Sequence, residues 1–254
     1  MRSIRIPASV ALVLALALTT PPPLAAQDLP PAEEIIDRYV EAIGGREAAL
    51  TPVSTRTTGS FSMPAMGVTG DLVLLTGEEN EMVTRVTVPG MGELLSGYTG
   101  EVGWSVDPLT GARLLDGLEL AAMEDQADRR YLVRDPALFE RFETVGEEAY
   151  GGEACWEIEY VWRSGRTSRE CYSKESGLVI AAVTTQASPM GSIEVVTEIS
   201  EYRRFGEILV PTSMRQNAMG QEQVMTIETV EFGTVEAAEF EPPAAIRTLI
   251  NAGG

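Results

Sequence analysis

The feature that most restricts the fold of this chain is the regular interruption of apolar runs by turn sequences between residues 55 and 232. Runs rich in β-branched and aromatic residues are broken at a spacing of about 8 to 12 residues, which is typical of all-β proteins. The interruptions are Gly-containing turns such as Pro89-Gly90, Thr99-Gly100, Ser164-Gly165 and Ser176-Gly177. This pattern predicts a mainly β fold of about eleven antiparallel strands joined by tight turns.

Four segments have the composition or spacing of helices. Residues 32–43 place apolar side chains on one helical face, and Gly44-Gly45 follows where a helix would end. Residues 114–128 are rich in Leu, Ala, Met and Glu, and residues 136–142 have the character of a helical turn. We expect these two segments to lie together against the sheet. Residues 244–250, after Pro242-Pro243, predict one short helix at the end of the domain.

The N-terminal residues are typical of a secretory signal peptide. Arg2 and Arg5 precede an uncharged apolar stretch over residues 8–18, and three prolines follow it at 21–23. This stretch is much shorter than the roughly 20 apolar residues that span a bilayer. We therefore expect residues 1–26 to be removed near Ala26, leaving a single domain over 27–254. Since no cysteine near the signal could accept a lipid, we expect a soluble periplasmic chain without stable membrane insertion.

The charge balance and the absence of histidine exclude several classes of function. The chain has 19 basic and 38 acidic residues, a net charge of −19, which becomes −21 when Arg2 and Arg5 leave with the signal. Phosphate backbones and anionic lipid surfaces would repel such a chain, so nucleic acid is not an expected partner. With no histidine, Ser-His-Asp triads and HExxH zinc sites are excluded. We predict no metal site and no cofactor.

The segment 155–162 carries the strongest local pattern. As a strand, it would place Trp156, Ile158, Tyr160 and Trp162 on one face and Cys155, Glu157 and Glu159 on the other. The aromatic face either forms core beneath the helices or lines a lipid pocket beside Trp104 and the Leu/Met side chains of 114–123. The candidate ligand-binding residues are Trp104, Leu118, Met123, Trp156, Ile158, Tyr160 and Trp162.

Two cysteines flank one predicted hairpin. An even pair in an oxidising compartment favours a structural disulfide between Cys155 and Cys171 over free thiols. A two-residue turn at Ser164-Gly165 would, however, place Cys155 opposite Lys174. A bridge to Cys171 therefore requires a longer loop or a bulge.

Methionine recurs beside glycine at predicted turns, as in Met66-Gly67, Met91-Gly92, Met190-Gly191 and Met219-Gly220. Without histidine, these side chains are better suited to adaptable apolar rims than to a copper site. Acidic pairs such as Glu124-Asp125 fit a solvated surface better than a glycosidase-like pair of carboxylates.

Five segments form a recognisable set: the helix end at 43–48 (IGGREA), residues 59–61 (GSF), the segment 97–104 (GYTGEVGW), the turn region 172–178 and the hairpin 202–211 (YRRFGEILVP). Together they resemble the LolA/LolB-like superfamily of periplasmic lipoprotein-sorting proteins and their relatives. The resemblance extends to the ending from Thr226 to Pro243. The resemblance implies an open antiparallel half-barrel whose concave face is covered by helices and can hold acyl chains.

Taken together, these observations lead us to expect a non-enzymatic periplasmic binder or carrier of lipid or lipoprotein acyl chains, with outer-membrane lipoprotein sorting as a candidate process. Residues 114–128 are the candidate lid. One alternative is an envelope interaction module that has no ligand cavity and binds a protein partner at a sheet edge or rim. Another is a carboxylate-based hydrolase. If the protein is a carrier, we expect an accessible apolar cavity, and if it is an interaction module, we expect a filled core. If it is a hydrolase, we expect two carboxylates that face each other in a cleft and have perturbed pKa values.

Overall fold

The chain forms one antiparallel sheet of 13 strands, in a computed structural model that describes residues 29–188, 191–218 and 220–252. The strand order is β6-β5-β4-β3-β2-β1-β13-β12-β11-β10-β9-β8-β7, so nearly all neighbours in the sheet are also neighbours in the sequence. Only the β1–β13 pair joins strands distant in sequence. The signal segment 1–26, Met190 and Met219 lie outside the described residues.

The strands and helices have the following bounds. The strands are β1 (Thr55–Met63), β2 (Val68–Thr76), β3 (Met82–Val88), β4 (Gly92–Tyr98), β5 (Gly103–Asp107), β6 (Gly111–Leu114), β7 (Phe139–Tyr150), β8 (Glu153–Trp162), β9 (Thr167–Ser173), β10 (Val179–Ser188), β11 (Gly191–Phe205), β12 (Ile208–Ala218) and β13 (Gln221–Phe232). The helices are α1 (Ala32–Ala42), α2 (Arg46–Leu50), α3 (Gly117–Ala127) and α4 (Ala244–Ala252), with short 3₁₀ turns η1 (Pro64–Met66), η2 (Arg129–Val133), η3 (Pro136–Leu138) and η4 (Ala237–Phe240).

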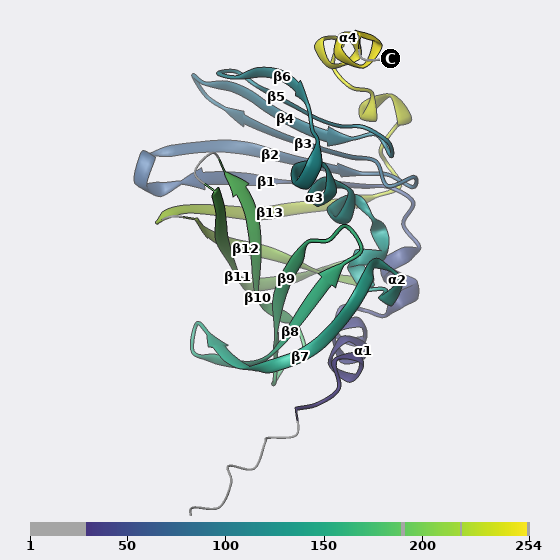
Figure 1. The fold of residues 1–254 in the computed structure, drawn as a ribbon, viewed down its shortest axis with the longest axis vertical. Coiled ribbons are helices and arrows are strands. Elements are labelled where there is room, and N and C mark those ends of the chain that lie inside the picture. Colours follow the sequence, from purple (N-terminus) through teal and green to yellow (C-terminus); the bar gives the residue numbers. More distant parts are fainter. Residues whose placement is uncertain (1–28, 189–190, 219, 253–254) are drawn as a thin grey trace, which may run out of the picture.

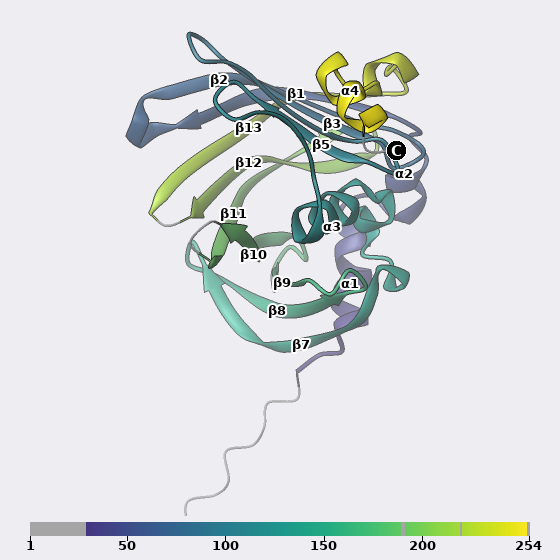
Figure 2. The same cartoon turned by 45° about the horizontal axis from the view of Figure 1, so that its top comes forward.

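The sheet is curved and open, which confirms the predicted half-barrel (Figures 1 and 2). Helices α1 and α3 lie inside the curve and α4 lies outside it, beside β5 and β6 (Figure 2). The strands number 13 rather than about eleven. Leu114, expected in a helix, belongs to the four-residue strand β6. The expected helical turn over 136–142 is helical only to Leu138, because Phe139 and Phe142 pair with β8 as the start of the edge strand β7.

The helices inside the curve gather at one end of the strands, which we call the helix end. The Ile43 carbonyl accepts a hydrogen bond from the Leu209 N–H (2.8 Å), and the Arg38 guanidinium donates to the carbonyls of Lys174 and Glu175 (2.8 and 2.7 Å). These contacts hold α1 against the β9–β10 and β11–β12 turns. Gly44 adopts a φ of +121°, and a Cβ there would lie 2.3 Å from the Glu207 carbonyl oxygen, so this close approach requires glycine.

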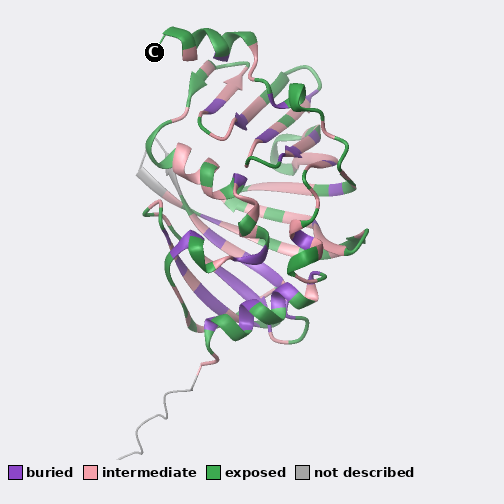
Figure 3. Ribbon diagram, turned by 90° about the vertical axis from the view of Figure 1, so that its right-hand side faces the viewer, coloured by how far each residue is buried: buried purple, intermediate pink, exposed green. Residues whose placement is uncertain are grey.

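Buried side chains form separate cores on the two faces of the sheet. Inside the curve, α1 packs Ile36, Tyr39 and Val40 onto the aromatic face of β8 and β9. Figure 3 shows these buried residues concentrated in α1 and the strands beside it. On the outer face, Phe240 and Ile246 cover β2, β3 and β5. Burial on both faces explains why so few strands show a clean alternation of apolar and polar residues.

A charged pair lies buried in the core beneath α1. Arg134 and Glu170 form an ion pair at 2.8 Å, with side chains 8% and 2% exposed. The hydroxyls of Tyr131 and Tyr172 donate to the Glu170 carboxylate, and Arg134 donates to the Tyr39 hydroxyl at 3.3 Å. Burial alone would raise the pKa of Glu170, but Arg134 and these hydrogen bonds hold it below the usual range. The pair is therefore fully hydrogen-bonded within the core.

The disulfide between Cys155 and Cys171 lies on the outer face, buried beneath Tyr150 and Ile180. Residues 163–166 connect β8 to β9, and the Trp162 N–H donates to the Arg166 carbonyl across this connection at 2.9 Å. The loop inside this hydrogen bond is three residues long, one more than the turn expected from the sequence, and Gly165 there has a φ of +83°. The additional residue places Cys155 opposite Ser173 and Cys171 opposite Glu157. Since one residue of register exchanges the two faces of a strand, this loop brings both sulfurs to the same face.

We predict that Glu170→Gln lowers the free energy of unfolding by about 3–5 kcal/mol, because it leaves the Arg134 charge buried without its counter-ion. Urea denaturation measures this loss. The double variant Glu170→Met/Arg134→Met should recover much of the stability, since it removes both charges together. Unchanged stability of Glu170→Gln would contradict the role given to the pair.

The lowered pKa of Glu170 also predicts the pH dependence of stability. The carboxylate contributes fully above the glutamate pKa of the unfolded chain, about 4.3, and its contribution is lost as the pH falls through the lower pKa of the folded state. Wild-type stability should therefore decrease more steeply below about pH 4 than that of the double variant. Parallel curves for the two proteins would contradict this assignment.

We further predict that Cys155→Ala/Cys171→Ala lowers the free energy of unfolding by about 3 kcal/mol, the contribution expected for a closed loop of about 15 residues. Denaturation with and without a reducing agent measures the effect. The reductant should destabilise the wild type and leave the double variant unchanged. A wild type that is insensitive to reduction after full unfolding and refolding would refute this contribution.

Candidate ligand-binding site

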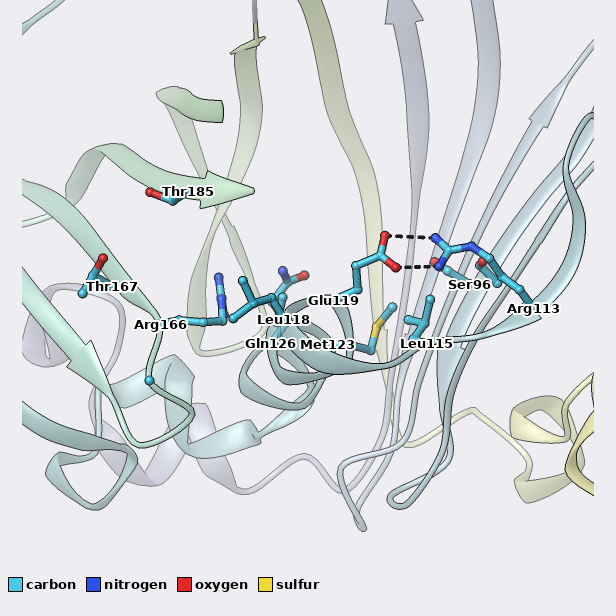
Figure 4. A pocket seen from close by; sticks show the side chains of 13 residues that line it. Ser96, Arg113, Leu115, Leu118, Glu119, Met123, Gln126, Arg166, Thr167 and Thr185 are labelled. Atoms are coloured by element: carbon cyan, nitrogen blue, oxygen red, sulfur yellow. Dashed lines mark hydrogen bonds and ion pairs between the residues drawn. The ribbon is translucent and has the colours of Figure 1, made fainter. Parts of the chain in front are cut away.

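A pocket of about 420 Å³ lies inside the curve of the sheet, between α3 and the two halves of the sheet that face each other across it (Figure 4). One wall consists of Ser96, Ser105 and Arg113, from β4, β5 and β6. The opposite wall consists of the β8–β9 loop with Arg166 and Thr167, together with Thr185 of β10. Helix α3 and the short segment before it contribute the apolar lining of Leu115, Leu118, Ala122 and Met123.

Helix α3 is amphipathic only in part, and this leaves apolar side chains facing the pocket. Leu120, Met123 and Ala127 pack with Met82 and Tyr98 on the inner face of the sheet. Leu118, in contrast, is 57% exposed although it is a large apolar residue. Exposed apolar groups within a concave site are characteristic of ligand-binding surfaces rather than of a finished core.

Two ion pairs attach α3 to the walls of the pocket. At its N-terminal end, Glu119 accepts two hydrogen bonds from Arg113 at 2.5 and 3.0 Å, and these bonds lower the pKa of Glu119. Both side chains are about half exposed. At its C-terminal end, Asp125 accepts hydrogen bonds from Arg166 and Ser164, each at 2.7 Å, and this group is largely buried. The C-terminal attachment is thus better shielded from solvent than the N-terminal one.

The inner face of the sheet continues beyond α3 as an apolar surface. Leu72, Val86 and Leu94 pair across β2, β3 and β4, one row beyond the row that contains Ser96. Phe61, Met225 and Met214 pair across β1, β13 and β12. Of these six, only Leu72 is buried. The other five belong to none of the clusters packed against helices in the described part of the chain.

The structure separates the sequence-predicted ligand residues into three groups. Leu118 and Met123 line the pocket. Ile158, Tyr160 and Trp162 are buried in the core beneath α1, with Trp156 packed at its margin. These four aromatic-face residues form the filled core that was the alternative interpretation of segment 155–162, and none of the described pockets includes them.

Trp104 differs from its expected position. It is 1% exposed on the outer face, where it packs against Phe240 and Ile246 near α4. Its ring covers Gly97, where a Cβ would lie 2.5 Å from the ring. Ser105 faces the pocket, and alternation along β5 sends its neighbour Trp104 to the other side. Trp104 is therefore removed from the candidate site.

Sequence reasoning missed the polar residues of the pocket. Ser96 and Ser105 pair directly across β4 and β5, and Arg113 pairs with Ser105 from β6. Alternation along these short strands groups the three side chains on one face, but the sequence does not tell which face lies inside the curve. Arg166 directly follows the predicted turn Ser164-Gly165 and carried no signal of its own.

Among the described residues, no group of three or more Cys, Asp or Glu side chains is arranged to hold a metal ion. The helices of the described chain are all too short or too polar to cross a membrane.

The sequence matches no known family profile, and it matches no curated protein. Solved structures, however, are similar in fold. A DUF1329 family protein from Desulfovibrio piger is 15% identical with a TM-score of 0.56, covering 85% of this chain and 99% of its own. A LolA superfamily protein from Nitrosomonas europaea is 12% identical with a TM-score of 0.55, covering 84% of this chain and 98% of its own.

A Vibrio parahaemolyticus domain named for outer-membrane lipoprotein sorting is 13% identical with a TM-score of 0.52, and the match covers 82% of this chain and 95% of that domain. At these identities the similarity establishes the fold and nothing finer. Over most of its length, this chain has the fold of the LolA superfamily and of the DUF1329 protein.

Proposed function

We propose that this protein is a non-enzymatic binder or carrier of a lipid or of lipoprotein acyl chains, acting in the periplasm after removal of residues 1–26. The observation that carries the proposal is the uncovered apolar inner face, which runs from Leu118 and Met123 in the pocket to Phe61, Leu94 and Met225 beyond α3. A long apolar ligand fits such a surface. The name of the Vibrio domain suggests outer-membrane lipoprotein sorting as the process.

The energy available from this surface is sufficient for a carrier. Burial of apolar groups contributes roughly 0.8 kcal/mol per methylene, so a 16-carbon chain gains on the order of 10 kcal/mol before the costs of ordering and association. The serines and arginines of the wall supply hydrogen-bond donors for a polar head group. Binding of this kind requires neither a nucleophile nor a general base, in keeping with the non-enzymatic role proposed.

The alternative roles have less support from the described residues. A carboxylate-based hydrolase requires two facing carboxylates in a cleft, whereas Glu119 is the one carboxylate among the residues that line the pocket, and its hydrogen bonds from Arg113 lower its pKa. Glu170 is enclosed by Arg134 and tyrosines and lines none of the described pockets. An interaction module with a filled core describes the half beneath α1 well. It does not account for the partly exposed apolar row of Phe61, Met214 and Met225.

Within this proposal, α3 acts as a lid that moves at its N-terminal end. The exposed Arg113–Glu119 pair contributes only about 0–1 kcal/mol, as is usual for surface ion pairs. Gly117, at the start of the helix, has a φ of +51°, and as a glycine it can change its backbone angles there at little cost. The buried Asp125–Arg166 pair fixes the other end. The helix would thus pivot near Asp125 and expose the apolar face.

We predict that Leu118→Asp/Met123→Asp weakens the binding of a 16-carbon fatty acid probe at least tenfold, because each substitution places a carboxylate on the apolar wall. Native mass spectrometry of the exported protein, with and without added probe, measures the occupancy. The matched control is Leu132→Asp, a comparably exposed leucine outside the pocket. Absence of any bound lipid in the wild type, both as purified and with excess probe, would refute the carrier function.

We also predict that Arg113→Gln speeds probe release several-fold, because it removes the exposed attachment of α3 while leaving the apolar wall intact. Stopped-flow displacement of a fluorescent fatty acid measures the release rate. Arg85→Gln is the matched control, since Arg85 forms an equally exposed pair with Glu93 on the same half of the sheet. Equal release rates for the wild type and Arg113→Gln would show that α3 does not open at this end.

A further inference from the structure

The end of the sheet opposite the helices carries a distinct set of hairpin turns. The β1–β2, β3–β4 and β5–β6 turns all lie at this end, because each follows a strand that runs away from the helix end. Figure 1 shows the β1–β2 hairpin on the left of the view and helices α1, α2 and α3 on the right. We call the three turns, over residues 64–67, 89–91 and 108–110, the hairpin rim.

Each turn of the hairpin rim exposes one large apolar side chain. Met66 is 60% exposed, Met91 50% and Leu109 86%, the highest value among the large apolar residues of the described chain. The β3–β4 and β5–β6 turns are adjacent, since a Cβ at Gly92 would lie 3.3 Å from the side chain of Pro108. The Asp107 carboxylate accepts hydrogen bonds from the N–H groups of Leu109 and Thr110 at 2.7 and 3.0 Å, which fixes the turn with Leu109 outermost.

The residues of the hairpin rim carry no charge themselves in an otherwise acidic chain, and the charged residues nearest to them in the sequence are Asp107 and Glu93. The Asp107 carboxylate is engaged by the backbone of its turn. Residues 57–70, 86–92 and 108–112 contain no Asp, Glu, Lys or Arg. At the helix end, in contrast, the turns carry acidic residues: Glu78, Glu79 and Glu81 between β2 and β3, Glu101 between β4 and β5, and Glu207 between β11 and β12. In the half of the sheet formed by β1 to β6, the uncharged apolar turns and the acidic turns therefore lie at opposite ends of the strands.

We infer that the hairpin rim docks this protein on the surface of a lipid bilayer. The rim is a set of single apolar side chains on separate turns, and none of these residues lines any of the pockets described above. Such a shape can enter the boundary between head groups and acyl chains without matching a particular partner surface. The charge distribution supports a membrane as the occupant, because it turns the acidic end away from anionic lipid and leaves an end that can lose water at little electrostatic cost.

Docking in this orientation would also bring the apolar inner face to the bilayer. Phe61 and Leu94 lie on strands that end in the rim turns, a few residues from Met66 and Met91. The docking surface itself does not depend on the proposed lipid-binding function, since it requires only the rim. A negative result for membrane docking can therefore be distinguished from a negative result for lipid binding in the pocket.

Flotation with neutral phosphatidylcholine vesicles tests this inference on protein exported with its own signal, with the loss of residues 1–26 verified by mass. Wild type should float with the vesicles, and Met66→Glu, Met91→Glu and Leu109→Glu should each lower the partition coefficient about tenfold, equivalent to about 1.4 kcal/mol. Val53→Glu and Leu132→Glu, exposed apolar residues away from the rim, should float like wild type.

Further variants separate the rim from the pocket and from misfolding. Leu118→Asp/Met123→Asp should still float, whatever its effect on lipid occupancy. Met66→Ser, Met91→Ser and Leu109→Ser remove the apolar side chains without adding a charge, and they should lower flotation too. In Leu109→Trp, the fluorescence of the added tryptophan should be quenched by brominated lipid. Failure of the wild type to float would overturn the inference. Flotation that survives in both the triple Glu variant and the triple Ser variant would overturn it as well.

Discussion

An antiparallel sheet that bends without closing leaves an inner face that the rest of the chain must cover. Here the helices cover that face only in part, and the rest of the structure depends on this partial cover. One half of the inner face, on β8 and β9, is sealed by α1 with an aromatic core and a hydrogen-bonded ion pair. The other half, on β1 to β6, has only α3 above part of it. Apolar side chains such as Phe61 and Leu94 stay partly exposed as a result. Since exposed apolar surface in a concave site carries a free-energy cost, its presence favours a binding role over a purely structural one.

Much of the architecture follows from local sequence patterns. The strands, the helix α1 and its glycine end, and the short C-terminal helix α4 all arise from periodicity and turn residues close together in the chain. The segment 136–142 shows the limit of this reasoning. Its composition favoured a helical turn, but pairing of Phe139 and Phe142 with β8 extends a strand instead. Tertiary pairing overrides local preference where aromatic residues gain a packed partner.

The candidate site was less predictable because it depends on which face of each strand lies inside the curve. Alternation correctly grouped Trp156, Ile158, Tyr160 and Trp162, yet it could not tell that α1 would seal them. The same ambiguity explains why Trp104, which was expected beside the pocket, lies on the outer face instead. The Arg134–Glu170 pair joins residues 36 positions apart, and Arg134 has a φ of +48° that no local motif announces. Glu170 and Tyr172 lie two residues apart on the inner face of β9, and neither Glu170 nor Arg134 was identified from the sequence.

The uneven cover implies uneven stability, and this bears on how a ligand could enter. The half beneath α1 combines a dense aromatic core, a buried ion pair and a disulfide across β8 and β9, so its local opening should be as costly as global unfolding. Helix α3 rests on fewer buried residues and one exposed ion pair. Because Arg166 lies on the loop between the disulfide-linked strands, the rigid half provides the fixed point for the C-terminal end of α3. Rigidity on one side of the pocket therefore makes a limited, directed movement on the other side possible without loss of the fold.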